Sequence, residues 1–354
     1  MIETIKLCER HIEIIDQTRL PGKFVIRKIR TVPDMVDAIR SLAVRGAPAI
    51  GIAAAFSLAL FLRHLKARTN EKLGLYWAAA VKALAESRPT AVNLFSALQR
   101  MDRIFRVNLD KDPLTLKNIV WQEALAVYNE DLDMSRRIGE AGAKLIRNGD
   151  VILTHCNAGG LATAGLGTAL AVLYTAKQAG KRFTVFADET RPLLQGSRLT
   201  VWELMQNDID VRLISDNMAA FAMKTKGITK VITGADRIAR NGDAANKIGT
   251  FNLSVLAKHH GIPLYIAAPS TTFDLSLDDG SGIPVEERRP EELTFFQNRP
   301  VAPAGAKVWN PAFDVTPANL ITAFITDRGL IRPPFRSSIR EKLAVRKPGN
   351  AVPG

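Results

Sequence analysis

Apolar residues recur at three- and four-residue spacings through the first part of the chain. The runs Ala53 to Leu65 and Leu75 to Ser87 carry Ala and Leu at these spacings, which predicts two helices. A longer amphipathic run from Leu116 to Ile146 predicts one bridging helix or two in series, ended by Asn148-Gly149-Asp150. The pattern therefore predicts a mainly helical N-terminal domain with a short β-rich start, over residues 1–130.

After Gly149 the pattern changes to short apolar segments that alternate with helical ones. The expected strands are VILTHC (Val151 to Cys156), FTVFAD (Phe183 to Asp188), VRLISD (Val211 to Asp216), KVITGAD (Lys230 to Asp236) and PLYIAAP (Pro263 to Pro269). This alternation predicts an α/β domain over residues 131–332, with a doubly wound, Rossmann-like parallel sheet. In the common strand order 3-2-1-4-5, the first and fourth strands are neighbours at the point where ligands bind.

The first of these strands leads into a glycine-rich segment, NAGGLATAGLG, which we expect to open a helix beside Cys156. Helix N-termini bind phosphate because their first N–H groups lack partners, so a small phosphorylated substrate is expected. Asp236 ends the fourth strand and is expected to face the same crevice. Cys156 and Asp236 are therefore the candidate catalytic pair. His155 points to the opposite face of its strand, which favours a packing role over a dyad with Cys156.

Other interpretations of the same residues remain open. A nicotinamide-dependent dehydrogenase would need G-x-G-x-x-G, but Gly165-x-Gly167 is followed three residues later by Leu170. Small residues in the glycine-rich segment also suit close packing of a helix on a sheet. A buried cysteine is usually inert, and an aspartate at a strand end often caps a helix. Catalysis is favoured only because Cys156 and Asp236 converge on one edge.

Composition narrows the class of protein. The chain has 354 residues, 47% of them hydrophobic, which indicates a globular fold with a sizeable core. No apolar stretch runs uninterrupted for the roughly 18 residues of a membrane helix, and the N-terminus is charged where a signal peptide would be apolar. We therefore expect a cytoplasmic protein without a membrane segment. Two cysteines, Cys8 and Cys156, are expected to be free thiols, and the histidine spacings predict no metal site.

The net charge of +13 is dispersed along the chain and lacks the aromatic platforms of single-strand binders. We therefore expect no nucleic-acid partner and a basic surface that attracts anionic metabolites. The basic tail, residues 333–354, is expected to be flexible, although Ile339 to Val345 suits a last helix. Further cations for a phosphate lie in Arg45 to Gly51, in Arg191 and Arg198, and in Asn246-Lys247, which is expected to open the helix after the fourth strand.

At these residues the chain resembles the methylthioribose-1-phosphate isomerases. The resembling segments are VRGAPAIG (Val44 to Gly51), LTHCNAGGLATAGLGTAL (Leu153 to Leu170), DETRPLLQGSRLTVWEL (Asp188 to Leu204), the stretch Thr233 to Asp274, IPVEER (Ile283 to Arg288) and VWNPAFDVTPANLITAFITDRG (Val308 to Gly329). The superfamily also holds the regulatory subunits of a eukaryotic initiation-factor exchange factor and archaeal ribose-1,5-bisphosphate isomerases.

The resemblance implies a homodimeric aldose-ketose isomerase of methionine salvage that uses no cofactor. Cys156 and Asp236 would be catalytic, with Asp236 as general acid or base. The implied substrate-binding residues are Arg45, Gly46, Ala47, Arg88, Gln195, Asn246 and Lys247. Two alternatives remain: an isomerase of another 5-modified ribose 1-phosphate, such as 5-deoxyribose 1-phosphate, and a non-catalytic protein that senses a sugar phosphate.

Overall fold

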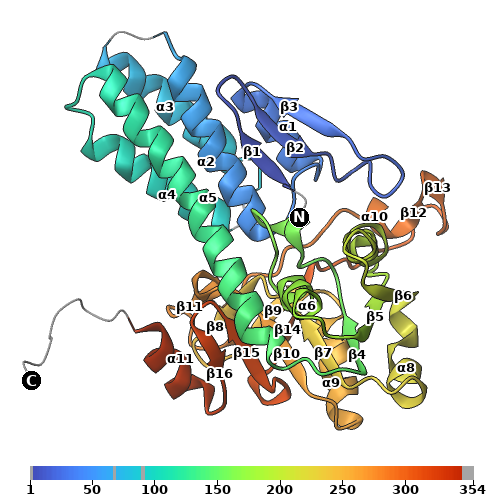
Figure 1. Ribbon diagram of the computed structural model, residues 1–354. Helices are drawn as coiled ribbons and strands as arrows, with labels where there is room; N and C mark the ends of the chain where they lie inside the picture. Colours follow the sequence, from blue (N-terminus) through green and yellow to red (C-terminus); the bar gives the residue numbers. More distant parts are fainter. Residues whose placement is uncertain (1–2, 67–68, 89–91, 345–354) are drawn as a thin grey trace, which may run out of the picture.

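The computed structural model describes residues 3–66, 69–88 and 92–344. The chain begins with a small antiparallel sheet, followed by a layer of helices (Figure 1). Its elements are β1 (Ile5–Leu7), β2 (Ile12–Ile15), β3 (Ile26–Ile29), α1 (Val32–Arg40), α2 (Ala47–His64), α3 (Asn70–Ala85), α4 (Val92–Val107) and α5 (Pro113–Ala143). Thr31 and Asp34 form a capping box that starts α1, since each side chain accepts from the other residue's backbone N–H.

The helix α2 is the core of this helical layer. Nearly every residue from Ala49 to Leu62 is buried, against α4, α5 and the first sheet. By length and composition α2 is the one helix in the described part of the chain that could cross a membrane, and 72% of its apolar window is buried inside the protein. A helix that is apolar on all sides is expected at such a central position.

The helix α5 joins the two halves of the molecule. It runs as one continuous helix of 31 residues from the helical layer to the large sheet (Figure 1), packing first on α2 and α4 and then on α6. Asp112 caps its start by accepting from the N–H groups of Leu114 and Thr115. Of the two possibilities for this run, one bridging helix is confirmed. The division of the chain after residue 130, which falls inside α5, stays a prediction.

The second half is built on a seven-stranded sheet. Its strands are β4 (Asp150–Thr154), β5 (Phe183–Asp188), β6 (Asp210–Ile214), β7 (Lys230–Thr233), β10 (Leu264–Ala267), β15 (Ala323–Thr326) and β16 (Gly329–Ile331). The order is β16-β15-β10-β7-β4-β5-β6. The five predicted strands thus lie in the predicted order 3-2-1-4-5, all parallel. The edge strand β16 pairs antiparallel with β15.

Helices cover both faces of this sheet, which confirms the doubly wound class. They are α6 (Ala169–Gln178), α7 (Val201–Met205), α8 (Ala219–Thr225), α9 (Thr250–His259) and α11 (Phe335–Leu343). Ile152 packs in one cluster with α6 and the end of α5, while the next residue, Leu153, packs in another with α9 and α11. Successive strand residues point to opposite faces, so one buried strand serves two cores.

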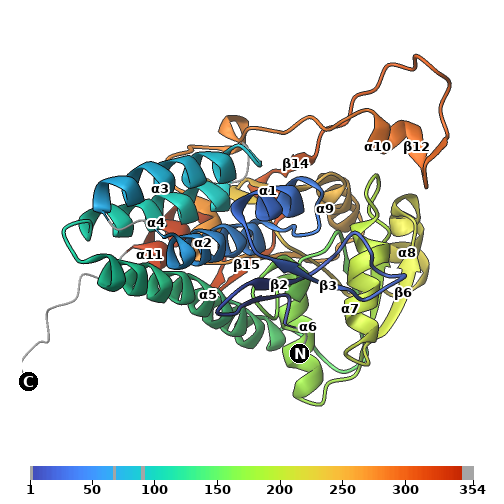
Figure 2. The same cartoon turned by 90° about the horizontal axis from the view of Figure 1, so that it is seen from above.

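A second, four-stranded sheet was not expected; two of its strands lie between β7 and α9 along the chain, and the other two come after α9. It has the order β11-β8-β9-β14 and comprises β8 (Arg237–Ala239), β9 (Ala244–Lys247), β11 (Phe273–Asp274) and β14 (Phe313–Thr316). The prediction that Asn246-Lys247 open a helix is therefore wrong: they end β9, and α9 begins at Thr250. A projecting segment carries α10 (Glu291–Thr294) and the hairpin β12 (Phe295–Phe296) and β13 (Arg299–Pro300) (Figure 2).

Two further expectations are corrected. The glycine-rich segment does not open a helix beside Cys156, because α6 begins only at Ala169 and the segment between is a loop with one short 3-10 turn, Gly160–Ala162. The expectation of a flexible tail is wrong for residues 335–343: the last helix suggested at Ile339 to Val345 is present as α11, which begins earlier, at Phe335, and buries Phe335 and Ile339. Residues 345–354 of that tail lie outside the described residues. The other short turns are η2 (Gly196–Thr200), η3 (Asp216–Met218), η4 (Ser270–Thr272), η5 (Gly280–Gly282) and η6 (Ala318–Leu320).

Candidate active site

A cavity of about 400 Å³ lies where the helical layer meets the carboxyl ends of β4 and β7. Eight of the nine predicted site residues line it: Arg45, Gly46, Ala47, Arg88, Cys156, Gln195, Asp236 and Lys247. The ninth, Asn246, lines a smaller adjoining cavity that Cys156 and Asp236 also border. The structure thus brings together residues that are up to two hundred positions apart in sequence.

Cys156 is held in an unusual backbone conformation directly after β4. Its φ of 59° lies in the left-handed region, which non-glycine residues rarely adopt. Two threonines fix this conformation: the N–H of Cys156 donates to Thr190 Oγ1 at 2.8 Å, and its carbonyl accepts from Thr200 Oγ1 at 2.5 Å. Such enforced strain is typical of functional positions, and here it turns the thiol into the cavity.

Asp236 and Lys247 enter the cavity from neighbouring positions of the β8–β9 hairpin. The N–H of Asp236 donates to Ala245 O, and Lys247 Nζ donates to Ala312 O at 2.9 Å. Burial raises the pKa of the Asp236 carboxyl, and the charges of Lys247, Arg88 and Arg45 offset part of this rise. Asp236 can therefore hold a proton for donation.

The thiol of Cys156 and the amine of Lys247 are also shifted by burial. Burial raises the pKa of Cys156 although Arg45 and Lys247 lower it, and burial lowers the pKa of Lys247 although Cys156 and Asp236 raise it. Each charged form is disfavoured by the removal of water. Because the pKa of Cys156 is raised, its side chain is favoured as the neutral thiol at neutral pH.

Arg45 and Gly46 stand at the start of α2. Gly46 is the N-cap residue with a φ of 92°, and a Cβ there would lie 2.5 Å from the backbone of Ala162. Only glycine allows this approach. Arg45 donates from both terminal nitrogens to Asn157, to Oδ1 at 2.5 Å and to the carbonyl at 3.1 Å. The start of the core helix is therefore tied to the loop that follows Cys156.

The cavity carries a strong excess of positive charge. Its cationic residues are Arg40, Arg45, Arg88, Arg198, Lys247, Arg288 and Arg289, against the carboxyl groups of Asp236 and Glu292. Arg88 also pairs with Glu286, 3.6 Å away. Arg40, at the end of α1, and Arg288, at the end of the IPVEER segment, were not predicted as site residues, because only the tertiary fold brings them to the cavity. The balance of charge fits a small anionic ligand.

Three buried polar atoms of cavity-lining residues have no hydrogen-bond partner in the described structure. They are Gln17 Oε1, Arg88 Nε and Gln195 Oε1. An unsatisfied buried polar group costs free energy, so a polar ligand that meets these atoms gains affinity. Gln195 directly precedes the π-helical turn η2, an element that recurs at functional sites.

His155 has the packing role predicted for it. It is 2% exposed, with Nδ1 2.9 Å from Asp188 Oδ2 and Nε2 2.8 Å from the carbonyl of Ile248. Burial alone would lower its pKa, but Asp188 and Ile248 raise it, while burial raises the pKa of Asp188 to about 6. Both ring nitrogens are engaged, so His155 has none left to act as a base on Cys156.

Among the residues that the structure describes, two groups of side chains place possible metal ligands within 4.8 Å of one another, Cys8-His11-Glu13 and His155-Asp188-Asp216. In the first, Glu13 already contacts His11, and Lys28 lies 3.7 Å from it. In the second, Asp216 accepts from the N–H groups of Thr190 and Arg191. None of these residues lines the large cavity. The expectation that the protein has no metal site stays a prediction.

The fold and the cavity define a class: a doubly wound α/β protein with a helical N-terminal half and an anion-attracting cavity between them. The profile of the initiation factor 2 subunit family matches residues 43–333. The 5-deoxyribose 1-phosphate isomerase of Moorella thermoacetica is 54% identical over 343 residues, 97% of this chain and 98% of that protein. The methylthioribose-1-phosphate isomerase of Geotalea uraniireducens is 52% identical over 337 residues, 95% and 97% of the two chains.

Comparison with solved structures points to the same family. The 5-methylthioribose 1-phosphate isomerase of Pyrococcus horikoshii has a TM-score of 0.92 and 42% identity, covering 97% of this chain and 96% of that one. The delta subunit of translation initiation factor eIF-2B from A. fulgidus has a TM-score of 0.89 and 44% identity, covering 98% and 100%. The chain belongs to the initiation factor 2 subunit family, among its methylthioribose-1-phosphate isomerase-like members. It is an isomerase.

Proposed function

We propose that this isomerase converts 5-methylthioribose 1-phosphate to 5-methylthioribulose 1-phosphate, a step of methionine salvage. The observation that carries the proposal is the placement of a protonatable carboxyl, Asp236, beside Cys156 in a cavity lined by cations. The names of the relatives from Geotalea uraniireducens and Pyrococcus horikoshii support the same substrate.

The phosphate group would be held by the cations of the cavity. Arg45 and Arg88 come from the helical half, and Lys247 from the β8–β9 hairpin. A guanidinium presents two parallel N–H donors to a phosphate, which fixes its orientation as well as its position. Gln195 and Asn246 offer amide groups suited to the ribose hydroxyls.

Asp236 would begin the reaction as the general acid. The substrate carries its phosphate on C1, so it has no free aldehyde and the ring cannot open unassisted. Protonation of the ring oxygen by Asp236 lets the C1–O bond break. The raised pKa of this buried carboxyl supports the role, because a carboxylic acid must keep its proton near neutral pH to donate it.

Hydrogen must then move from C2 to C1. In a hydride route, the hydride passes directly and the C2 hydroxyl proton goes to the Asp236 carboxylate, which restores the acid. In a proton route, a Cys156 thiolate removes the C2 proton and an enediol phosphate forms; the Cys156 thiol then returns a proton to C1 while the C2 hydroxyl proton goes to the Asp236 carboxylate. Burial raises the pKa of Cys156, which supports the first route, with the thiol shaping the site.

Proton NMR of the purified chain with 5-methylthioribose 1-phosphate tests the proposal. We expect the anomeric signal to disappear, faster than with ribose 1,5-bisphosphate, and no turnover by Asp236→Asn. In D2O the hydride route leaves C1 without deuterium, while exchange at C1 would show the proton route. Full activity of Asp236→Asn would contradict its assignment as the acid.

One observation favours a second candidate substrate, 5-deoxyribose 1-phosphate. The relative from Moorella thermoacetica is named for that sugar, and the apolar side of the cavity, with Leu42, Leu193, Leu199 and Phe313, suits either 5-substituent. The same NMR time course, run with each sugar, gives kcat/KM for both, and the sugar with the higher value is the preferred substrate. Absence of turnover with each sugar would contradict both candidate substrates. A homodimer and a cytoplasmic location stay predictions.

A further inference from the structure

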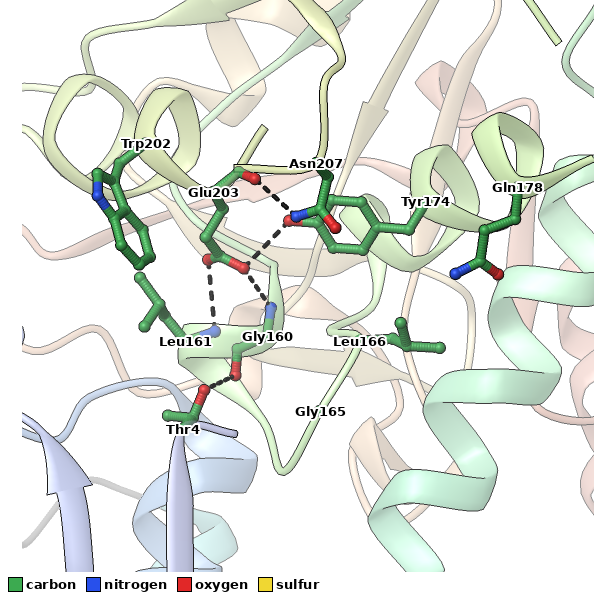
Figure 3. Close-up of a pocket in the computed structure, with 10 residues that line it drawn as sticks. All are labelled: Thr4, Gly160, Leu161, Gly165, Leu166, Tyr174, Gln178, Trp202, Glu203 and Asn207. Atoms are coloured by element: carbon green, nitrogen blue, oxygen red, sulfur yellow. Dashed lines mark hydrogen bonds between the residues drawn. The ribbon is translucent and has the colours of Figure 1, made fainter. Parts of the chain in front are cut away.

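Glu203 is a buried carboxylate directly behind the loop that follows Cys156. It lies on α7, is 5% exposed, and borders a small pocket of about 40 Å³ apart from the large cavity (Figure 3). Four groups donate to its two oxygens: Asn157 Nδ2 at 2.7 Å, Gly160 N at 2.7 Å, Leu161 N at 3.3 Å and Tyr174 OH at 3.1 Å. Burial raises the pKa of Glu203, and these hydrogen bonds offset part of the rise. A buried carboxyl group that is hydrogen-bonded in this way holds its neighbours firmly.

The loop is shaped to let this carboxylate approach. A Cβ on Gly159 would lie 2.5 Å from both carboxylate oxygens of Glu203. Glycine at this position therefore leaves the space that the carboxylate occupies. Of the two adjacent glycines in the sequence motif, Gly159 is explained by this contact.

The hydrogen bonds at Glu203 determine which way the Asn157 amide faces. The Asn157 amide nitrogen and the N–H groups of Gly160 and Leu161 can only donate, and they fall on both oxygens, so each oxygen of Glu203 acts as an acceptor. The Asn157 nitrogen donates to Glu203 Oε1 and to Thr200 Oγ1, which leaves the Asn157 oxygen on the opposite side. That oxygen accepts from Arg45 NH1 at 2.5 Å. A chain of directed hydrogen bonds thus runs from Glu203 through Asn157 to Arg45.

We propose that Glu203 is a positioning residue for Arg45, whose guanidinium it aims into the cavity through the amide of Asn157. Glu203 lines only the small pocket behind the loop, so it acts through Asn157. The inference deepens the proposed function, because it rests on Arg45 as a ligand of the substrate phosphate. A glutamine in place of Glu203 replaces one acceptor oxygen by an NH2 group that cannot accept from its neighbours. With that NH2 group toward Asn157, the Asn157 amide turns its nitrogen toward Arg45, and the guanidinium loses its side-chain acceptor and keeps only the Asn157 carbonyl.

Glu203→Gln tests the proposal, with Tyr174→Phe as the matched control. Tyr174→Phe removes one donor from the same carboxylate but leaves the bond from Asn157 intact. Inorganic phosphate is the probe, titrated in a thermal-shift assay beside steady-state kinetics with the sugar phosphate. We expect Glu203→Gln to weaken phosphate binding about tenfold and to raise KM by a similar factor, with kcat within about threefold of wild type. Tyr174→Phe should stay within about twofold in both.

A second variant keeps the test decisive if Glu203→Gln does not fold. Asn157→Ala removes the link to Arg45 and leaves the other bonds to Glu203, and it should weaken phosphate binding to the same extent. Combined with Glu203→Gln it should add nothing further, since both interrupt one chain of contacts. Wild-type phosphate affinity in Glu203→Gln, or in Asn157→Ala, overturns the proposal.

The outcomes separate this inference from the proposed function. If wild type binds phosphate, the variants lose it and no sugar phosphate is turned over, Glu203 is confirmed as a positioning residue and the proposed reaction is wrong. If wild type turns over the methylthio sugar while Glu203→Gln keeps its KM, the reaction is right and the positioning role is wrong. A wild-type chain that fails to bind inorganic phosphate also overturns the role given to Arg45.

Discussion

Cys156 shows how much of a residue's chemistry depends on its surroundings. It is 8% exposed and faces Arg45 and Lys247, yet the loss of water outweighs both charges and raises the pKa of its thiol. The expected helix start that would have acidified it is absent, since α6 begins thirteen residues further on at Ala169. The structure therefore favours a thiol at this position where the sequence left a thiolate possible.

This pKa direction predicts a slow reaction of Cys156 with iodoacetamide at pH 7. In a Cys8→Ser variant, which leaves Cys156 as the only cysteine of the chain, labelling should be slower than for a free thiol and should accelerate as the pH rises through the raised pKa. Mass spectrometry at a series of pH values measures this, and inorganic phosphate should slow it further. Fast labelling at pH 7 would mean that Arg45 and Lys247 hold a thiolate.

The candidate site could be predicted from the sequence where its residues lie in motifs next to strand ends. Cys156 and Asp236 were paired because the strand order placed β4 beside β7, and the structure has that order. Asn157 and Glu203 were not singled out, since a buried hydrogen-bond chain depends on how a loop and a helix meet. Sequence spacing carries no signal for such a contact.

At the scale of elements, α5 anchors the glycine-rich loop at a second point, beyond the residues that Glu203 holds. Asp131 of α5 is 6% exposed and accepts from Ala164 N at 2.7 Å. Burial raises the pKa of Asp131 from 3.8 to about 6. The loop is thus held between two buried carboxylates, one from each neighbouring helix.

Because this pKa is raised, we expect Asp131 to lower the free energy of unfolding by an amount that depends on pH. Between about pH 4 and pH 6 the unfolded chain has released the proton that the folded chain still holds, so stability falls as pH rises and the cost is complete above pH 6. Asp131→Asn keeps an acceptor for Ala164 and removes the charge. We expect it to be more stable than wild type at pH 7 by up to about 3 kcal/mol, with the gain vanishing near pH 4.

Urea denaturation at several pH values measures this difference. Asp133→Asn is the control, because Asp133 lies on the exposed face of the same helix and its pKa is lowered by Arg136 and Arg137. The control should show little change, and in the opposite direction. If the difference in free energy of unfolding between wild type and Asp131→Asn does not vary with pH, the idea that the buried Asp131 charge destabilises the fold is wrong.

Elements with strong periodicity were predictable, and insertions between them were not. The central parallel strands β4, β5, β7 and β10 and the long helix α5 bury apolar residues at regular spacings, which leaves a clear pattern in the sequence. The hairpin β8–β9 is short. Some of its residues line the cavity, and β9 also pairs with β14, so they follow no regular apolar pattern. Its pattern, GADRIARNGDAANK, therefore resembled a turn that leads to a helix.

At the scale of the whole molecule, the C-terminal helix α11 completes the core on one face of the large sheet. Phe335 is 5% exposed and its ring lies 4.8 Å from that of Phe324, which in turn packs on Phe273. The segment is rich in basic residues and was expected to be flexible. Its two buried residues, Phe335 and Ile339, are one helical turn apart and face the same side.

Phe335→Ala should therefore destabilise the protein by about 3 to 5 kcal/mol, the usual cost of emptying a buried aromatic site. Guanidinium denaturation gives the free energy of unfolding, and Arg340→Ala, an exposed substitution on the same helix, is the control. Arg340→Ala should remain within about 0.5 kcal/mol of wild type. Equal stability of the two variants would mean that α11 adds nothing to the core.

The charges of the cavity have a consequence for the way the two halves of the chain are held together. Arg45 comes from the helical half and Arg198 and Lys247 from the other half, so an anion in the cavity is attracted to both halves at once. A dianion that binds in the cavity therefore contacts both the helical half and the half built on the large sheet. The resistance of this enzyme to unfolding is therefore set by the salts around it as well as by its own packing, and buffer composition is an experimental variable for every stability measurement.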